Sequence, residues 1–281
     1  MFSEATHAGR VNLRYCRGPA AGPPLVMVHG VTRRGADFAP VLAALSQRWE
    51  VFTLDQRGHG ESARADSYVV RDYAADLADF LRQVVGRPAA LFGHSLGALA
   101  ALTVAGSGTK LLGLALSDPP APSIVNDLDA TSFGPQFRGM HKIAAAEAST
   151  AERAKMLADM VVSKPKATVV KLGDIRDPAS LRWMAACLGK CDPAAIAAFI
   201  ENRWLEGLDV AELAGSVMCP TLLLQADPLA GGMLPDEEVA SLTAPIADVT
   251  RIRYRGIGHL LHWFDPVGTL NPTLAFLESL R

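Results

Sequence analysis

The chain has 281 residues, of which 49% are hydrophobic and 20% are charged, a balance typical of a folded protein with a large apolar core. The formal net charge of −2 offers no basic surface, so we expect neither nucleic acid nor an anionic membrane as a partner. The sequence has no apolar run long enough to span a membrane, no signal-peptide core at its start and no C-x-x-C pair among its four cysteines, which predicts a cytoplasmic protein with free thiols.

Short apolar runs alternate with amphipathic segments through the first part of the chain. The apolar runs have the length of buried strands, whereas residues 11–17 alternate loosely and predict an edge strand. The predicted buried strands are 25–28, 51–54, 89–92 and 111–116, and the segments with helical spacing are 38–47 and 68–85. Strands that alternate with helices indicate right-handed crossovers and a mainly parallel sheet flanked by helices.

The strand pattern stops after Asp118 and returns with predicted strands at 221–224 and 249–254, which precede a C-terminal helix. We therefore predict an α/β core formed by residues 1–118 and 217–281. Residues 119–216 are predicted to form a helical lid over the edge of the sheet where ligands bind. The lid carries side chains that could line an apolar substrate pocket or could simply pack the lid onto the core: Phe133, Phe137, Met140, His141, Trp183 and Trp204.

The sequence Gly93-His94-Ser95-Leu96-Gly97 lies between a predicted strand and an Ala/Leu-rich predicted helix. A G-x-S-x-G sequence in this context indicates a nucleophile elbow, a sharp turn that presents a serine at the edge of the sheet. The glycines leave room where the helix passes close to the strand, and the turn leaves the N–H of Leu96 free to donate to an oxyanion. Any glycine-rich turn can contain a serine by chance, so the prediction that Ser95 is a nucleophile depends on its partners.

A serine hydroxyl needs a neighbouring base to react near neutral pH, and His259 is the best candidate. It follows a predicted strand within a Gly-x-Gly-His turn and precedes the last helix. The base needs a carboxylate that fixes its tautomer, and the chain order Ser, acid, His places that acid between Ser95 and His259. Asp227, after strand 221–224, is the first choice; Asp118, after strand 111–116, is the alternative acid, and Asp236 comes third.

A second backbone N–H is expected to complete an oxyanion hole, and Val31 is the candidate donor. It follows His29-Gly30 at the end of a central strand, where a glycine lets the backbone turn its amides inward. His29 is expected to brace this loop and not to react. Arg33 and Arg34 come next, and we expect two solvated arginines there, although they could attract an anionic substrate group.

Four segments together resemble the α/β-hydrolase superfamily: residues 25–30, 55–62, 93–97 and 256–259. The resemblance covers residues 11–119 and 220–281 and is closest to a cofactor-free group of bacterial esterases, lactonases, carbon–carbon bond hydrolases and non-haem haloperoxidases. It implies an α/β-hydrolase fold without a metal or an organic cofactor, and a structural role near the site for residues 55–62. Haloalkane dehalogenases and epoxide hydrolases of this superfamily carry an aspartate where this chain has Ser95, which disfavours those two activities.

The combined expectation is a serine hydrolase that cleaves a small, largely apolar carboxylic ester or lactone through an acyl-enzyme. Ser95 would attack the carbonyl with His259 as its base and Asp227 orienting that base, while the N–H groups of Val31 and Leu96 hold the oxyanion. Three alternatives remain open. They are hydrolysis of a carbon–carbon bond in a diketone, cofactor-free oxygenation by the His–Asp pair, and a ligand receptor that retains the triad without turnover.

Overall fold

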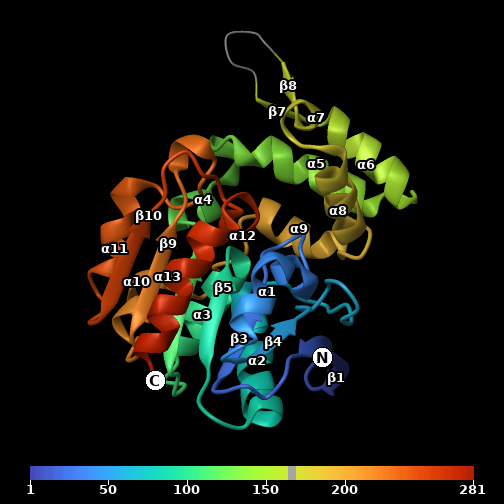
Figure 1. Ribbon diagram of the computed structural model, residues 1–281. Coiled ribbons are helices and arrows are strands. Elements are labelled where there is room, and N and C mark those ends of the chain that lie inside the picture. The colour runs from blue at the N-terminus through green and yellow to red at the C-terminus, as the bar shows by residue number, and fades with distance from the viewer. Residues whose placement is uncertain (164–168) are drawn as a thin grey trace.

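An eight-stranded sheet forms the centre of the molecule, and the computed structural model describes residues 1–163 and 169–281 around it (Figure 1). The strand order is β1-β2-β4-β3-β5-β6-β9-β10, with β1–β2 and β2–β4 antiparallel and every further pair parallel. The mainly parallel sheet is as predicted, but the expected edge strand is second in the sheet because β1 pairs outside it. The strands are β1 Ser3–Ala8, β2 Asn12–Arg17, β3 Pro24–Val28, β4 Glu50–Leu54, β5 Ala90–His94, β6 Gly113–Ser117, β9 Thr221–Gln225 and β10 Val249–Arg253.

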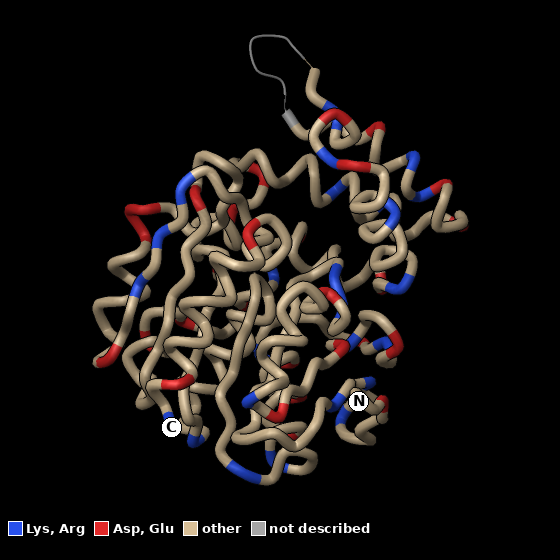
Figure 2. Tube along the Cα trace, in the orientation of Figure 1, with Lys and Arg blue, Asp and Glu red and all other residues tan. Residues whose placement is uncertain are grey.

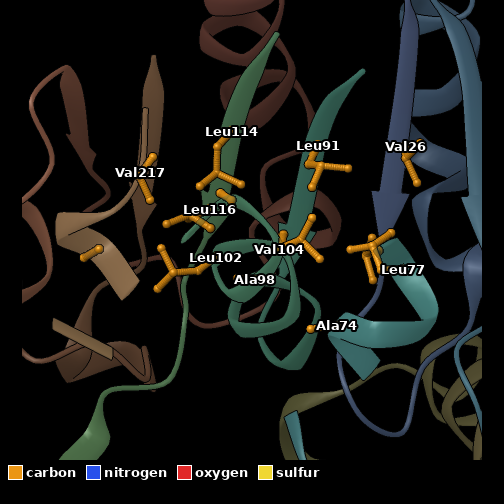
Figure 3. Packing of buried hydrophobic residues seen from close by; sticks show 14 of the residues in the cluster. Val26, Ala74, Leu77, Leu91, Ala98, Leu102, Val104, Leu114, Leu116 and Val217 are labelled. Carbon is orange, nitrogen blue, oxygen red and sulfur yellow. The ribbon is translucent and has the colours of Figure 1, made fainter. Parts of the chain in front are cut away.

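The central strands of the sheet are buried on both faces. β3, β5, β6 and β9 are buried at every residue and contain no acidic residue, lysine or arginine; Figure 2 shows the charged residues mainly on the surrounding helices and loops. Val26, Leu91 and Leu114 contribute to the core on one face (Figure 3), and Leu25 and Phe92 contribute to the core on the other. Such uninterrupted apolar strands suit a parallel sheet enclosed between two layers of helices.

Helices supply both of those layers. α2, α3, α10 and α11 bury apolar side chains against the face that carries Val26, whereas α1, α12 and α13 cover the face that carries Leu25. The predicted helices at 38–47 and 68–85 are present, the second as α2 followed by a π-helical turn, Leu81–Val85. The bounds are α1 Ala39–Leu45, α2 Val70–Phe80, α3 Leu96–Gly106, α10 Val210–Gly215, α11 Val239–Thr243, α12 Leu261–Phe264 and α13 Pro266–Ser279.

Between β6 and β9 the chain leaves the sheet and forms a helical insertion, residues 119–209, which stands to one side of the sheet (Figure 1). Two of its helices begin at Asp177-Pro178 and Asp192-Pro193, because each aspartate caps its helix and each proline suits the first helical position. Asp177 accepts the N–H groups of Ala179 and Ser180, and Asp192 accepts that of Ala194. Its elements are α4 Pro122–Asn126, α5 Phe133–Ala145, α6 Thr150–Asp159, α7 Leu172–Ile175, α8 Pro178–Leu188, α9 Pro193–Ile200 and the antiparallel strands β7 Val161–Ser163 and β8 Val170–Lys171.

The insertion ends earlier than the predicted boundary at residue 216. The helix α10 already packs against α3, since a Cβ added to Gly106 of α3 would lie 2.6 Å from the carbonyl oxygen of Leu213. Ala214 of the same helix belongs to the core on the face of the sheet that carries Val26. The segment that stands away from the sheet is therefore shorter than the sequence pattern indicates.

The helical insertion shares one apolar cluster with the core helices α2 and α3, which contribute Tyr73, Leu96 and Leu99 to it. Phe137 meets Phe199 edge-to-face with ring centroids 4.6 Å apart, and Phe199 stacks on Trp204 at 4.0 Å. Trp204 is fully buried and Phe137 is 8% exposed. These two residues could have lined a substrate pocket or packed the lid onto the core, and the structure places both in this shared cluster. Phe133 and Met140 pack partly buried against it.

Candidate active site

Ser95 occupies the sharp turn between β5 and α3. Its backbone has φ 54° and ψ −121°, a strained conformation for a residue with a side chain. This is the geometry expected of a nucleophile elbow, and it places Ser95 at the carboxyl end of a central strand. The turn is held from the neighbouring strand, because the N–H of Ser95 donates to the carbonyl oxygen of Ser117 at 3.0 Å.

The glycines around Ser95 are required by close backbone approach. A Cβ on Gly97 would lie 2.2 Å from the carbonyl oxygen of Val28, and one on Gly93 would lie 2.3 Å from that of Gly97. A Cβ on Gly30 would lie 3.0 Å from the Cβ of Ser95. The loop that follows β3 is therefore packed directly against the serine.

His259 and Asp118 form the hydrogen bond that a Ser-His-Asp triad needs. The Nδ1 atom of His259 lies 2.6 Å from Oδ2 of Asp118, whose side chain is fully buried after β6. Two backbone N–H groups hold the same carboxylate: Met233 donates to Oδ2 at 2.8 Å and Ala226 donates to Oδ1 at 3.1 Å. With Nδ1 engaged by the carboxylate, Nε2 is the ring nitrogen left to exchange protons with a substrate or nucleophile.

The first choice of acid, Asp227, is wrong as the partner of His259. Asp227 is partly exposed and accepts hydrogen bonds from the N–H groups of Gly256 at 2.7 Å and Leu229 at 3.0 Å, so it braces the turn that leads to His259. Both Asp118 and Asp227 follow parallel strands, but β6 lies next to β5 whereas β9 is one strand further away. That strand order cannot be obtained from the residues around either aspartate.

The two predicted oxyanion donors lie beside Ser95. Leu96 is the first residue of α3, so its N–H has no acceptor within the helix. Val31 directly follows Gly30, the residue packed against the serine. Over residues 1–163 and 169–281 neither N–H donates a hydrogen bond, and both residues are buried. Buried amides without an acceptor are rare, and they are available to a ligand atom.

Two buried histidines connect the loops beneath the site. His29 accepts the N–H of Gln56 on Nε2 at 3.0 Å and His59 accepts the N–H of Thr32 on Nε2 at 3.3 Å, while each Nδ1 bonds a nearby backbone carbonyl. Both rings must be neutral to accept on Nε2. Burial lowers the pKa of His29 to about 4 and that of His59 to about 3. The loop 55–62 is thereby tied to the loop that carries Val31.

His94 holds the backbone of the candidate base. Its Nε2 donates to the carbonyl oxygen of His259 at 3.0 Å, and the two rings lie 4.6 Å apart. Burial holds the pKa of His94 well below its usual range, so the ring is a neutral donor. His94 therefore contacts the segment that positions His259.

Sequence reasoning missed Asp37 and misplaced Arg33. Arg33, expected in solvent, is 6% exposed and pairs with the buried carboxylate of Asp37 at 2.5 Å. Trp183 of the insertion donates to the same carboxylate at 3.0 Å and so contacts the core, whereas His141 lies partly exposed on α5. No local pattern distinguishes Asp37 from a surface residue at the start of a helix.

The described part of the chain contains no cluster of three or more His, Cys, Asp or Glu side chains arranged to hold a metal ion. None of its helices combines the length and the apolar composition needed to cross a membrane.

A family model described as the alpha/beta hydrolase family matches residues 25–271. The chain belongs to this family. A 2-(acetamidomethylene)succinate hydrolase of Mesorhizobium japonicum is 38% identical over 105 residues, which are 37% of each chain. An sn-1-specific diacylglycerol lipase of Xenopus laevis is 33% identical over 178 residues, which are 61% of this alpha/beta hydrolase and 54% of the relative. These two matches thus span about a third to a half of the relatives' own lengths.

Three further matches cover 92–99% of this chain at lower identity. An N-formylmaleamate deformylase of Pseudomonas putida is 24% identical over 261 residues, covering 92% of this chain and 90% of the relative. The crystal structure of E-2-(acetamidomethylene)succinate hydrolase has a TM-score of 0.72 at 20% identity and covers 99% of this chain and 100% of that one. An enol-lactonase of Burkholderia xenovorans has a TM-score of 0.75 at 17% identity, covering 98% of this chain and 100% of that one. Likeness at such identities shows the fold.

Replacement of Gly97 by alanine is expected to destabilise the protein by at least about 2 kcal/mol, because the new Cβ would overlap the carbonyl of Val28. Chemical denaturation of Gly97→Ala measures this loss. Gly215→Ala is the matched control, since its Cβ would meet nothing closer than 3.6 Å, and its stability should be unchanged or slightly higher. Equal stability of Gly97→Ala and the wild type would contradict the close approach.

Stability is expected to fall as the pH is lowered from about 6.5 towards 5. Over this range the unfolded chain protonates His29 and His59 whereas the folded chain, with pKa values of about 4 and about 3, does not. Each histidine changes the free energy of unfolding by up to about 1.4 kcal/mol per pH unit in this range. Above pH 6.5 neither histidine lowers the stability further. Urea denaturation at several pH values measures the slope, and a free energy of unfolding that is constant between pH 6.5 and 5 would contradict it.

Proposed function

We propose that this alpha/beta hydrolase is a serine hydrolase that cleaves a small carboxylic ester or lactone through an acyl-enzyme. The observation that supports this proposal most is the 2.6 Å contact between His259 and the buried Asp118, formed on the strand next to the elbow that carries Ser95. The proposal assigns Ser95 as nucleophile, His259 as base and Asp118 as the acid that orients the base.

In the proposed mechanism His259 takes the proton from Ser95 through Nε2 as the serine oxygen attacks the carbonyl carbon. Asp118 stabilises the imidazolium that forms, and its two backbone donors keep the carboxylate in place. The N–H groups of Val31 and Leu96 donate to the oxyanion. The imidazolium protonates the leaving alcohol, and His259 then activates a water molecule that releases the acid and restores Ser95.

The helical insertion is proposed to act as a lid over this site. Its contacts with residues that follow the strands support this role, since Trp183 reaches Asp37 after β3 and Asp192 accepts a hydrogen bond from Tyr68 at 2.7 Å. A covered site excludes water and strengthens the hydrogen bonds to a developing oxyanion.

Amide hydrolysis by the same residues is the second candidate. Two relatives are named 2-(acetamidomethylene)succinate hydrolase and N-formylmaleamate deformylase, and these names refer to acetamido and N-formyl compounds. The leaving nitrogen of an amide depends more strongly on protonation than the leaving oxygen of an ester does. The His259–Asp118 pair would have to supply that proton. Small N-acetyl and N-formyl amides should therefore be assayed beside the esters.

Hydrolysis of p-nitrophenyl esters from acetate to octanoate tests the proposed function. Wild-type protein is expected to turn over the series with a chain-length optimum, and Ser95→Ala is expected to lose that activity. Residual hydrolysis by Ser95→Ala at the wild-type rate would contradict the nucleophile. Hydrolysis of amides alone would favour the second candidate.

Asp118→Asn and Asp227→Asn form a matched pair that tests the acid. Asp118→Asn is expected to lower kcat by about 10³–10⁴-fold, because an amide no longer stabilises the imidazolium or fixes its tautomer. Asp227→Asn removes a brace only, so its kcat should stay within about tenfold of the wild type. Steady-state kinetics at matched folded fractions, checked by circular dichroism, measures both. A larger loss in Asp227→Asn than in Asp118→Asn would overturn the assignment.

A further inference from the structure

A buried carboxylate outside the proposed triad receives donors from three separate parts of the chain. Asp37 lies in a short 3-10 helix, Gly35–Phe38, and its side chain is fully buried. Its Oδ1 accepts from the Nε1 atoms of Trp183 at 3.0 Å and Trp263 at 2.9 Å and pairs with Arg33 at 2.5 Å. Its Oδ2 accepts from Nε2 of His262 at 3.0 Å.

Each donor belongs to a segment that the proposed site uses. Arg33 comes two residues after the oxyanion donor Val31, and His262 and Trp263 come three and four residues after His259. Trp183 lies on α8 of the helical insertion. Asp37 forms no hydrogen bond or ion pair with Ser95 or with the Asp118–His259 pair within the described residues, so it is connected to them through these segments.

Because Asp37 is ionised, each of its hydrogen-bond donors is needed to compensate the buried charge. Burial opposes ionisation, but the Arg33 guanidinium and the hydrogen bond from His262 together hold the pKa of Asp37 well below its usual range. A buried charge that loses one of its donors is left partly uncompensated, and the structure must then rearrange or admit water. The three segments are consequently held relative to one another and not merely packed side by side.

Aromatic contacts surround the same junction. The rings of Trp183 and Trp263 lie 6.1 Å apart, and the guanidinium of Arg34 lies 4.5 Å from the centre of the Trp183 ring. Arg176, just before α8, lies 4.3 Å from the centre of the Phe264 ring on α12. These contacts join the insertion to the His259 side of the core around the buried carboxylate of Asp37.

We propose that Asp37 is a positioning residue that couples the seating of the helical insertion to the placement of the Val31 loop and of His259. When Trp183 is hydrogen-bonded to Asp37, the carboxylate binds the insertion, the Val31 loop and the segment after His259 at once. The positions of these three segments are then fixed relative to one another. Loss of the insertion's donor therefore changes the segment after His259, although that segment is not itself altered. The catalytic part of this proposal rests on the proposed function, whereas the coupling between segments does not.

Variants that each remove one hydrogen-bond donor or one charge test the contacts of Asp37 separately. Trp183→Phe and Trp263→Phe keep an aromatic ring and remove one N–H donor each, and Asp37→Asn removes the charge. Trp204→Phe is the matched control. Trp204 is fully buried in the apolar cluster that the insertion shares with α2 and α3, it stacks on Phe199, and its Nε1 has no partner among the described residues. Removal of the Trp204 N–H group should change neither kcat and KM nor the amide hydrogen exchange of residues 257–264.

Steady-state kinetics on a p-nitrophenyl ester gives the first measurement. Trp183→Phe is expected to raise KM about three- to tenfold with kcat little changed, because the insertion is less firmly seated over the substrate. Trp263→Phe is expected to lower kcat about tenfold with KM little changed, because the His259 segment loses its anchor. Asp37→Asn should change both. Variants that lose thermal stability alone, with kcat and KM of the folded enzyme at wild-type values, would show a structural carboxylate only and overturn the proposal.

Hydrogen–deuterium exchange gives a measurement that needs no activity. Trp183→Phe is expected to increase amide exchange in residues 257–264 as well as in α8, whereas Trp204→Phe is not. If Trp183→Phe increases exchange at 257–264 but the wild type hydrolyses no ester, the coupling is supported and the proposed function is contradicted. Exchange confined to α8, in an enzyme that hydrolyses esters, would overturn the coupling and leave the proposed function intact.

Discussion

Six neighbouring strands of this protein, from β4 to β10, run parallel, so their carboxyl ends meet at one edge of the sheet. Every residue proposed to take part in catalysis follows one of these strands, because the edge is where side chains from distant parts of the sequence come together. The constraint originates in the apolar runs of β3, β5, β6 and β9, which can be buried only between two helical layers. The site is therefore a consequence of how the core is enclosed.

Close backbone approach is the second constraint on the site. α3 passes so near to β3 and β5 that Gly93 and Gly97 cannot carry side chains, and the resulting turn leaves Ser95 at positive φ. The strain at Ser95 is supported by the packing around it, including the bond from its N–H to Ser117. The arrangement keeps the Leu96 amide at the start of a helix, where it is available to an oxyanion.

The sequence could predict features that depend on local pattern. The parallel sheet, the elbow at Ser95 and the turn before His259 each have a signature of a few consecutive residues with a physical reason for their spacing. The pairing of His259 with Asp118 has no such signature, because it depends on which strand lies next to β5, and two aspartates at strand ends looked equivalent. Apolar residues of the insertion were ambiguous for the same reason. Trp204 packs in the cluster that joins the insertion to α2 and α3, and no local feature distinguishes that role from lining a pocket.

Asp37 illustrates what sequence reasoning cannot reach. Its donors come from residues 146, 225 and 226 positions further along the chain, and its burial follows from how three segments meet. Arginine and aspartate four residues apart read as a surface pair, yet here they form a buried ion pair beneath the insertion. Long-range polar contacts of this kind become visible only with the fold.

Catalysis as proposed depends on Ser95 being an activated nucleophile. Treatment with a fluorophosphonate, followed by tandem mass spectrometry of the digested protein, tests it directly, because such reagents form a stable covalent bond with an activated serine. One adduct per chain is expected, located on Ser95. An unmodified protein, or an adduct on another residue with Ser95 free, would contradict it.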